Sequence, residues 1–280
     1  MSYPWSDLFP LLGMGWIITA LLMTILWLVQ RRTGNAAIVD VGWPASIPLL
    51  ALIYLLAGSS GGVALPEVLA TAMALLWGGR LALYLYRTRI HGHREEEGRY
   101  RQLREDWGSA FQGKLYVFYQ AQAILGVVFS LPFALLAAAG ADDQSVAPSM
   151  GVSPMFWGGL ALWVLAFSGE ALADRQLTRF KADPANRGKV CEAGLWAYSR
   201  HPNYFFEFNV WVAFALMALD APGGWVAWLC PALMLFFLFR VTGIPATEEQ
   251  ALRSKGEAYR RYMATVSPFI PWFRRRVPTP

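Results

Sequence analysis

Long runs of apolar residues alternate with polar connections along most of the chain. Seven runs are long enough to cross about 30 Å of hydrocarbon as helices that rise about 1.5 Å per residue. They lie approximately at residues 8–30, 38–57, 63–86, 115–139, 154–173, 203–219 and 224–244. This pattern predicts an all-α fold, a polytopic membrane bundle of seven transmembrane helices.

The polar connections differ in charge from one end of the predicted bundle to the other. Those after the first, third, fifth and seventh runs are rich in Lys and Arg, whereas those near 58–62, 140–153 and 220–223 contain neither. Because Lys and Arg gather in cytoplasmic loops, we expect the N-terminus outside and the C-terminus in the cytoplasm. The membrane would be a bacterial inner membrane, or the endoplasmic reticulum in a eukaryote. No basic segment precedes the first run, so we expect it to be a span and not a cleaved signal.

Composition supports a membrane protein, since 56% of the 280 residues are hydrophobic and 15% are charged. The net charge of +5 is explained by the basic loops, so nucleic acid is not an expected partner. Cys191 and Cys230 indicate no disulfide framework. We expect one membrane domain over 1–280 that ends in a cytoplasmic amphipathic segment, 245–280, and we infer no obligate protein partner.

Two polar segments carry apolar residues at helical spacing. Residues 95–112 predict an amphipathic helix that lies on the bilayer or covers the bundle, with Tyr100, Leu103, Trp107 and Phe111 on its apolar face. In the C-terminal segment, Thr247 and Gln250 suggest a capping box at a helix start. The basic residues at 274–276 suggest a topology signal or a patch for lipid headgroups.

A dense group of polar side chains lies between residues 194 and 207, just before the sixth run: Tyr198, Ser199, Arg200, His201, Asn203, Tyr204 and Glu207. Pro202 favours a helix start, which would leave free N–H groups beside Arg200 for a phosphate. Glu207 shares a helix face with Asn203 and could accept hydrogen bonds from an amide such as a nicotinamide carboxamide. The alternative is a membrane-interface anchor, with Glu207 paired to an intramembrane Arg.

Other candidate residues lie near the predicted cytoplasmic ends of the second and third runs. Arg80, Tyr84, Arg87 and His91 recur at helical spacing, which indicates one face for an anionic ligand or, alternatively, an interfacial basic and aromatic belt. Asp40 is either a proton donor or polar anchor for substrate, or simply a helix-start acid.

The loops supply further cofactor candidates. Cations that can meet a phosphate are Arg179, Lys181, Arg187 and Lys189, while Asp174 could accept hydrogen bonds from a ribose or an amide. Glu248 and Arg253 could close over a nucleotide. The chain has neither a Rossmann fingerprint nor a P-loop, so a nucleotide would need a pocket of helix ends and loops. With three histidines and no metal-binding spacing, we expect no metal site.

A family resemblance rests on these motifs. Tyr-Ser-Arg-His-Pro-Asn-Tyr at 198–204 with Glu207, together with 39–43, 99–104 with Trp107, 243–245 and 269–272, resembles the bacterial DUF1295 family, which is related to steroid 5α-reductases and sterol C14 reductases. The resemblance covers most of the chain. The Arg-His-Pro-x-Tyr part alone is also similar to a motif for S-adenosylmethionine in isoprenylcysteine carboxyl methyltransferases.

The reductase resemblance implies NADPH bound from the cytoplasm and hydride transfer to an activated C=C bond of a steroid-like or other lipid. Asp174, Asn203, Glu207 and Arg87 then match cofactor contacts, and Tyr84 matches a catalytic tyrosine, with Asp40 and Glu207 as further catalytic candidates. The Gln-Glu pair with which steroid reductases engage the ketone is missing from residues 38–57. Two alternatives stay open: an S-adenosylmethionine-dependent methyltransferase and a non-catalytic lipid-binding or transport protein.

Overall fold

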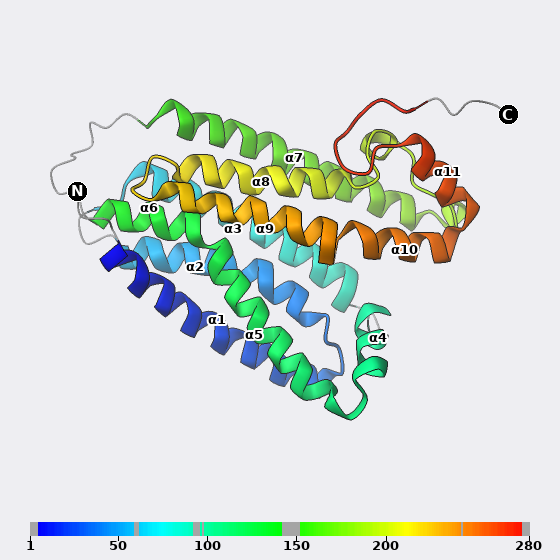
Figure 1. The fold of residues 1–280 in the computed structure, drawn as a ribbon, viewed down its shortest axis with the longest axis horizontal. Coiled ribbons are helices and arrows are strands. Elements are labelled where there is room, and N and C mark those ends of the chain that lie inside the picture. The colour runs from blue at the N-terminus through cyan, green and yellow to red at the C-terminus, as the bar shows by residue number, and fades with distance from the viewer. Residues whose placement is uncertain are drawn as a thin grey trace. The chain divides into compact units, whose positions relative to one another are not determined.

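A computed structural model describes residues 5–58, 62–91, 96, 98–141, 152–241 and 243–275. Of the residues discussed above, those at 95, 97 and 276 and most of the connections near 58–62 and 140–153 lie outside these ranges. The described residues are predominantly helical, and their only β-type pairing is an isolated bridge between Ser199 and Ser267. Figure 1 labels the helices along the chain, which divides into two compact units. Unit 1 comprises Met1–Phe156 and Met217–Ala227, and unit 2 comprises Trp157–Leu216 and Trp228–Pro280.

Unit 1 begins with three long helices, α1 (Trp5–Thr33), α2 (Ile38–Gly58) and α3 (Leu65–Leu85). Helices α2 and α3 approach closely where Gly78 faces two prolines inside α2. A Cβ atom at Gly78 would lie 2.5 Å from the Pro44 carbonyl oxygen and 2.8 Å from the Pro48 ring. The missing side chain therefore sets the distance between the two helices.

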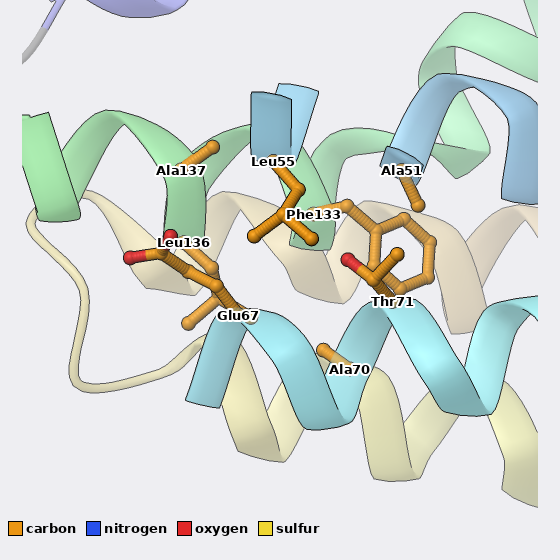
Figure 2. A pocket seen from close by; sticks show the side chains of 8 residues that line it. All are labelled: Ala51, Leu55, Glu67, Ala70, Thr71, Phe133, Leu136 and Ala137. Atoms are coloured by element: carbon orange, nitrogen blue, oxygen red, sulfur yellow. The ribbon is translucent and has the colours of Figure 1, made fainter. Parts of the chain in front are cut away.

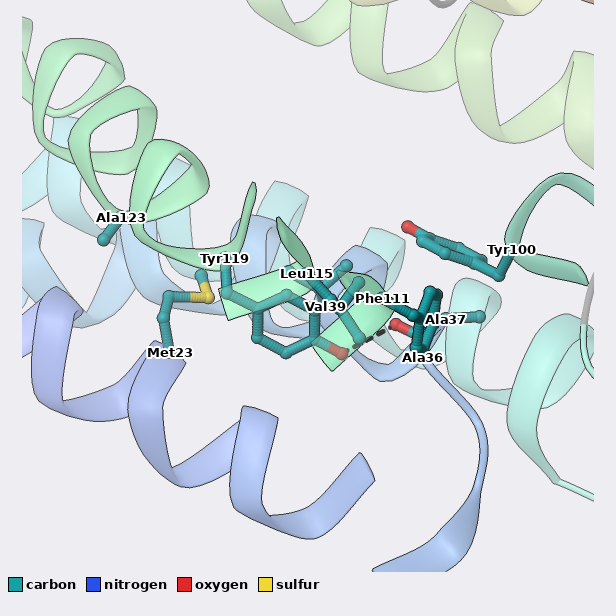
Figure 3. Close-up of a cluster of buried hydrophobic side chains, with 9 residues drawn as sticks. All are labelled: Met23, Ala36, Ala37, Val39, Tyr100, Phe111, Leu115, Tyr119 and Ala123. Carbon is teal, nitrogen blue, oxygen red and sulfur yellow. Dashed lines mark hydrogen bonds between the residues drawn. The ribbon is translucent and has the colours of Figure 1, made fainter. Parts of the chain in front are cut away.

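The next segment of unit 1 covers the end of these helices. It consists of α4 (Gly98–Trp107), the short η3 (Gly108–Ala110) and α5 (Phe111–Phe129). Tyr100 of α4 and Phe111 of α5 are buried in an apolar cluster with the chain before α2, and the Tyr119 hydroxyl donates to the Ala36 carbonyl at 2.8 Å (Figure 3). The predicted amphipathic helix over 95–112 is therefore present as α4. The next helix, α5, begins at Phe111, four residues before the predicted start at residue 115.

Unit 2 contains a long polar loop. Helix α7 (Pro154–Ala182) is followed by η4 (Pro184–Asn186), η5 (Gly194–Ala197) and α8 (Pro202–Ala218). After η6 (Gly224–Trp228), the chain continues through α9 (Leu229–Phe236), the π-helical turn η7 (Phe237–Val241), α10 (Ile244–Lys255) and α11 (Glu257–Thr265). Helices α7 and α8 pack tightly, because a Cβ atom at Gly169 would lie 2.5 Å from the Phe206 ring.

Several helices can cross a membrane, as the apolar runs predict. Among the described residues five are long and apolar enough, and a sixth span arises if α5 and α6 (Leu131–Ala141), which are bent by 42°, count as one. Helix α8 has 17 residues, so at about 1.5 Å per residue it is shorter than the hydrocarbon core. The chain is thus an integral membrane protein, whereas seven spans and the orientation of the termini stay predictions.

Two local predictions are corrected. The third helix does not keep α-helical spacing to His91, because Tyr86–Ile90 forms a π-helical turn, η2, in which the His91 amide donates to the Tyr86 carbonyl. The capping box is wrong, because α10 already begins at Ile244 and the Thr247 hydroxyl donates to the Gly243 carbonyl. Pro245 within the first turn explains the earlier start.

Candidate functional site

The loop before α8 is held against the end of α7. Gly194 adopts a φ of +61°, and a Cβ there would lie 2.3 Å from the Gln176 side chain. The Leu195 amide donates to Gln176 Oε1 at 2.9 Å, and the Trp196 indole donates to the Ala173 carbonyl at 3.0 Å. Pro202 is the first residue of α8, as predicted from the sequence.

Arg200 is buried within unit 2. Its Nε donates to Glu248 Oε1 at 2.6 Å, and its Nη1 donates to the carbonyls of Met263 and Val266 at 3.0 and 2.7 Å. The side chains of Arg200 and Glu248 are only 9% and 13% exposed. His201 Nε2 lies 3.2 Å from the same Glu248 oxygen. These contacts connect the loop to α10 and to the C-terminal segment.

The C-terminal segment runs alongside the same loop. The Arg200 amide donates to the Ser267 carbonyl at 2.8 Å, and the Trp272 amide donates to the Tyr198 carbonyl at 2.9 Å. The Ser199 hydroxyl, which is buried, donates to the Phe269 carbonyl at 2.7 Å. Hydrogen bonds of both main chain and side chain thus fix residues 198–200 and 267–272 to each other.

Two buried tyrosines support this loop from α11. The Tyr262 hydroxyl donates to the Trp196 carbonyl at 2.6 Å and lies 3.2 Å from the Ser199 carbonyl. Burial raises the pKa of Tyr262 well above its ordinary value and the pKa of Tyr259 to about 12. Both phenols therefore stay protonated near neutral pH, so the Tyr262 hydroxyl remains a donor to the loop.

An acidic and amide cluster lies deeper between α7 and α8. Glu170 and Asp174 are buried one turn apart on α7, and Asn203 and Glu207 are half-buried one turn apart on α8. Asn203 Nδ2 donates to Asp174 Oδ1 at 3.4 Å, and the Trp211 indole donates to Glu207 Oε1 at 3.1 Å. Asn203 Oδ1 is buried without a hydrogen-bond partner among the described residues. A buried acceptor of this kind is costly unless a ligand or water supplies a donor.

Exposed cations continue from this cluster toward the end of α7. Arg179 and Lys181 lie about 8 and 10 Å beyond Asp174 along the helix axis, at about 1.5 Å per residue. Arg187 and Lys189 are exposed in the following loop, and Arg253 is exposed on α10, where it pairs with Glu249. Tyr204 stacks on His201, with ring centroids 5.3 Å apart, and Tyr198 is 46% exposed. These residues can reach an anionic group outside the loop.

The remaining candidates belong to unit 1. Arg80 and Tyr84 are half-buried on α3, whereas Arg87 and His91 are exposed at the π-helical turn and its end. The four residues therefore do not form the single regular stripe that helical spacing predicted. The family resemblance grouped Arg87 and Tyr84 with Asp174, Asn203 and Glu207 as contacts of one site. The two groups lie in different units, so this joint site stays a prediction.

Asp40 is the acceptor at the centre of a polar network in unit 1. Its carboxylate accepts from Arg89 Nη1, from Arg99 Nη2 at 3.0 Å and from the Tyr100 hydroxyl at 2.7 Å. A neighbouring pair joins Arg104 and Glu96 at 3.1 Å. The sequence did not reveal these partners of Asp40, because they lie 49 to 60 residues away. The only sign of this network in the sequence was the mixture of acidic and basic residues over 95–106.

A narrow gap with no room for a water molecule lies in unit 1 among α2, α3 and α6 (Figure 2). Glu67 and Thr71 are its polar residues, and the rest of the lining is apolar. Glu67 stands in the first turn of α3 and hydrogen-bonds the backbone of Ala64, which explains the acid as a helix-start residue. Among the described residues, no group of three or more His, Cys, Asp and Glu side chains is placed to hold a metal ion.

Comparison with known proteins places this chain in a family. The family model described as "Protein of unknown function (DUF1295)" matches residues 26–266. The chain belongs to the DUF1295 family. It is 26% identical over 277 residues to an uncharacterized protein of Schizosaccharomyces pombe, covering 92% of this chain and 78% of that protein.

A second relative has a name that specifies a reaction. The chain is 26% identical over 115 residues to a protein of Ustilaginoidea virens named "Probable O-methyltransferase ustE", which covers 41% of this chain and 39% of that protein. No solved structure gave a significant match. The family is thereby established, and the predicted link to steroid reductases rests on the sequence motifs alone.

Proposed function

We propose that this protein is an NADPH-dependent membrane reductase that acts on an activated C=C bond of a lipid. The observation that carries the proposal is the acidic and amide cluster of unit 2, in which Asn203 Oδ1 is buried without a partner among the described residues. A carboxamide N–H is a suitable donor for that oxygen. Residues that fit the nicotinamide carboxamide of NADPH therefore lie near cations that fit the phosphates of NADPH.

Within unit 2, the roles divide by burial. Asn203 and Glu207 would orient a carboxamide, Asp174 would hold Asn203 through its Nδ2 group, and the exposed cations Arg179, Lys181, Arg187 and Lys189 would bind phosphates. Arg200 would act mainly indirectly, because three of its five N–H donors already serve Glu248 and two carbonyls. When bound, NADPH supplies a hydride to the β carbon of the polarised alkene.

The proton for the α carbon is assigned to Tyr84 or Asp40 from the sequence alone. Tyr84 is preferred for this role from the family resemblance, since a phenol can donate a proton to a developing enolate. Asp40 is less suited, because its oxygens accept hydrogen bonds from two guanidinium groups and one phenol.

A second candidate is an S-adenosylmethionine-dependent methyltransferase. The partial match to the probable O-methyltransferase of Ustilaginoidea virens favours it. This cofactor has a single carboxylate and no phosphates, so most of the exposed cations beyond Asp174 would find no anionic partner in it. Cofactor preference and the effect of those cations therefore separate the two activities.

The test is a binding titration of the purified full chain in detergent with NADPH and, separately, with S-adenosylmethionine. We expect NADPH to bind, and Asn203→Leu to weaken binding at least about tenfold by removing the buried acceptor. Asn209→Leu is the matched control on the same helix, since Asn209 Nδ2 donates to its own helix at Phe205. Tight binding of S-adenosylmethionine without NADPH binding would favour the methyltransferase. Binding of neither would favour a lipid-binding or transport protein.

A further inference from the structure

An exposed aromatic patch lies on the C-terminal segment of unit 2. Ile270, Trp272 and Phe273 are 58%, 67% and 77% exposed, and Tyr198 beside them is 46% exposed. The rings of Tyr198 and Phe273 are 6.4 Å apart in an edge-to-face arrangement. We call these four residues the aromatic patch. Large apolar side chains grouped in this way usually mark a surface that another phase or molecule covers.

The backbone beneath the patch is fixed, so its exposure does not come from a loose chain end. The Trp272 amide donates to the Tyr198 carbonyl at 2.9 Å, and the Arg275 amide donates to the Thr265 carbonyl at 2.8 Å. Phe269, which is 7% exposed, points the other way and packs on Phe205, Phe208 and Phe239. The segment thus keeps one aromatic residue inside unit 2 and presents the next ones outward.

The depth of the patch within unit 2 fits a membrane surface. Its partner loop is bonded to Ala173 and Gln176 of α7, where the apolar part of that helix gives way to charged residues. The aromatic patch therefore stands at the level where a spanning helix leaves the hydrocarbon. Trp and Tyr are enriched at this level, because their rings are apolar and their polar atoms remain hydrated.

The charge beside the patch indicates which lipids it meets. Arg274 and Arg275 follow Phe273 and are exposed, and the segment 267–275 contains no acid. Arg274 does pair with Glu192 at 2.9 Å, but both side chains are 42% exposed and such pairs are weak. Cations directly next to interfacial aromatic residues complement negatively charged headgroups.

We propose that the aromatic patch, with Arg274 and Arg275, docks onto the anionic phospholipid headgroups at the surface of the membrane that the protein spans. Because the same segment is bonded to residues 198–200, docking also holds the loop before α8 in place. The partner is thus the bilayer itself, bound through phosphate groups and the adjoining acyl region. The proposal does not require that the cluster between α7 and α8 binds a cofactor.

The experiment uses the full chain with Phe273→Cys, labelled with the environment-sensitive fluorophore nitrobenzoxadiazole. The native thiols Cys191 and Cys230 are buried, so the unsubstituted chain serves as the labelling blank. Ala185→Cys, in the exposed η4 turn, is the matched control. Each protein is placed, one copy per disc, in lipid nanodiscs of phosphatidylcholine alone or of equal parts phosphatidylcholine and phosphatidylglycerol.

We expect the label at 273 to emit at shorter wavelength than the label at 185, and to be protected from aqueous iodide at least twofold more. Protection should increase with phosphatidylglycerol, and Arg274→Gln with Arg275→Gln should remove that increase while the melting temperature stays unchanged. The proposal is overturned if the labels at 273 and 185 are quenched equally, or if protection of the label at 273 is the same with and without phosphatidylglycerol. Protection seen only in vesicles that hold many copies also overturns it, since a second copy would then be the partner.

Discussion

Replacement of Arg200 by Ala should release the C-terminal segment from the loop before α8. Three hydrogen bonds disappear, and Glu248, 13% exposed, loses the guanidinium that balances its charge. Removing one partner of a buried ion pair costs about 3–5 kcal/mol. Because about 1.4 kcal/mol corresponds to a factor of ten, opening of this contact should become about 10² to 4 × 10³ times more frequent.

Hydrogen exchange followed by mass spectrometry measures this opening directly. The Trp272 and Arg275 amides, which donate to Tyr198 and Thr265, should exchange much faster in Arg200→Ala than in the wild type. Arg253→Ala is the matched control, because Arg253 and Glu249 form an exposed pair one turn apart, 76% and 63% exposed. Such a pair is worth less than about 0.5 kcal/mol. Equal exchange of residues 267–275 in the two variants would refute the assigned role of Arg200.

Three further predictions concern other parts of the chain. Gly78→Ala should destabilise the protein by about 1–3 kcal/mol, because the added Cβ meets Pro44 and Pro48. Gly79→Ala, with open space around it, should be neutral or stabilising. Similar melting temperatures for the two variants would contradict the close helix contact. Asp40→Asn should lower the melting temperature more than Glu257→Gln, because Asp40 accepts from two guanidinium groups whereas Glu257 forms only an exposed pair with Arg260. The reverse order of melting temperatures would count against the Asp40 network. Cys191 should react with iodoacetamide at least about tenfold more slowly than a free thiol at pH 8. Burial raises the pKa of Cys191 and so lowers its thiolate fraction. Reaction at the free-thiol rate would show that the loop around Cys191 is open.

The sequence predicted the helices well, because their signals are local. The run 38–57 corresponds to α2 at Ile38–Gly58, and Pro202 starts α8 as its missing N–H group favours. The spacing of the apolar residues over 95–112 likewise indicated that the side chains of Tyr100 and Phe111 are buried. Each of these features depends on residues within a few turns of one another.

Contacts between distant segments could not be predicted in this way. Arg200 was expected to meet a phosphate, yet its donors reach Glu248, Met263 and Val266, which lie 48 to 66 residues away. Asp40 likewise draws its partners from α4 and from the π-helical turn. That turn is itself a departure from the 3.6-residue period on which the prediction for Arg87 and His91 rested.

The central claim is that this membrane protein binds a nicotinamide dinucleotide through unit 2. The most direct measurement is native mass spectrometry of the purified full chain, released from detergent after addition of NADPH. The account predicts one NADPH per chain for the wild type and for Asn209→Leu, and little or none for Asn203→Leu. An unliganded wild-type chain at NADPH concentrations far above those in cells, or equal loading of Asn203→Leu and the wild type, would contradict it.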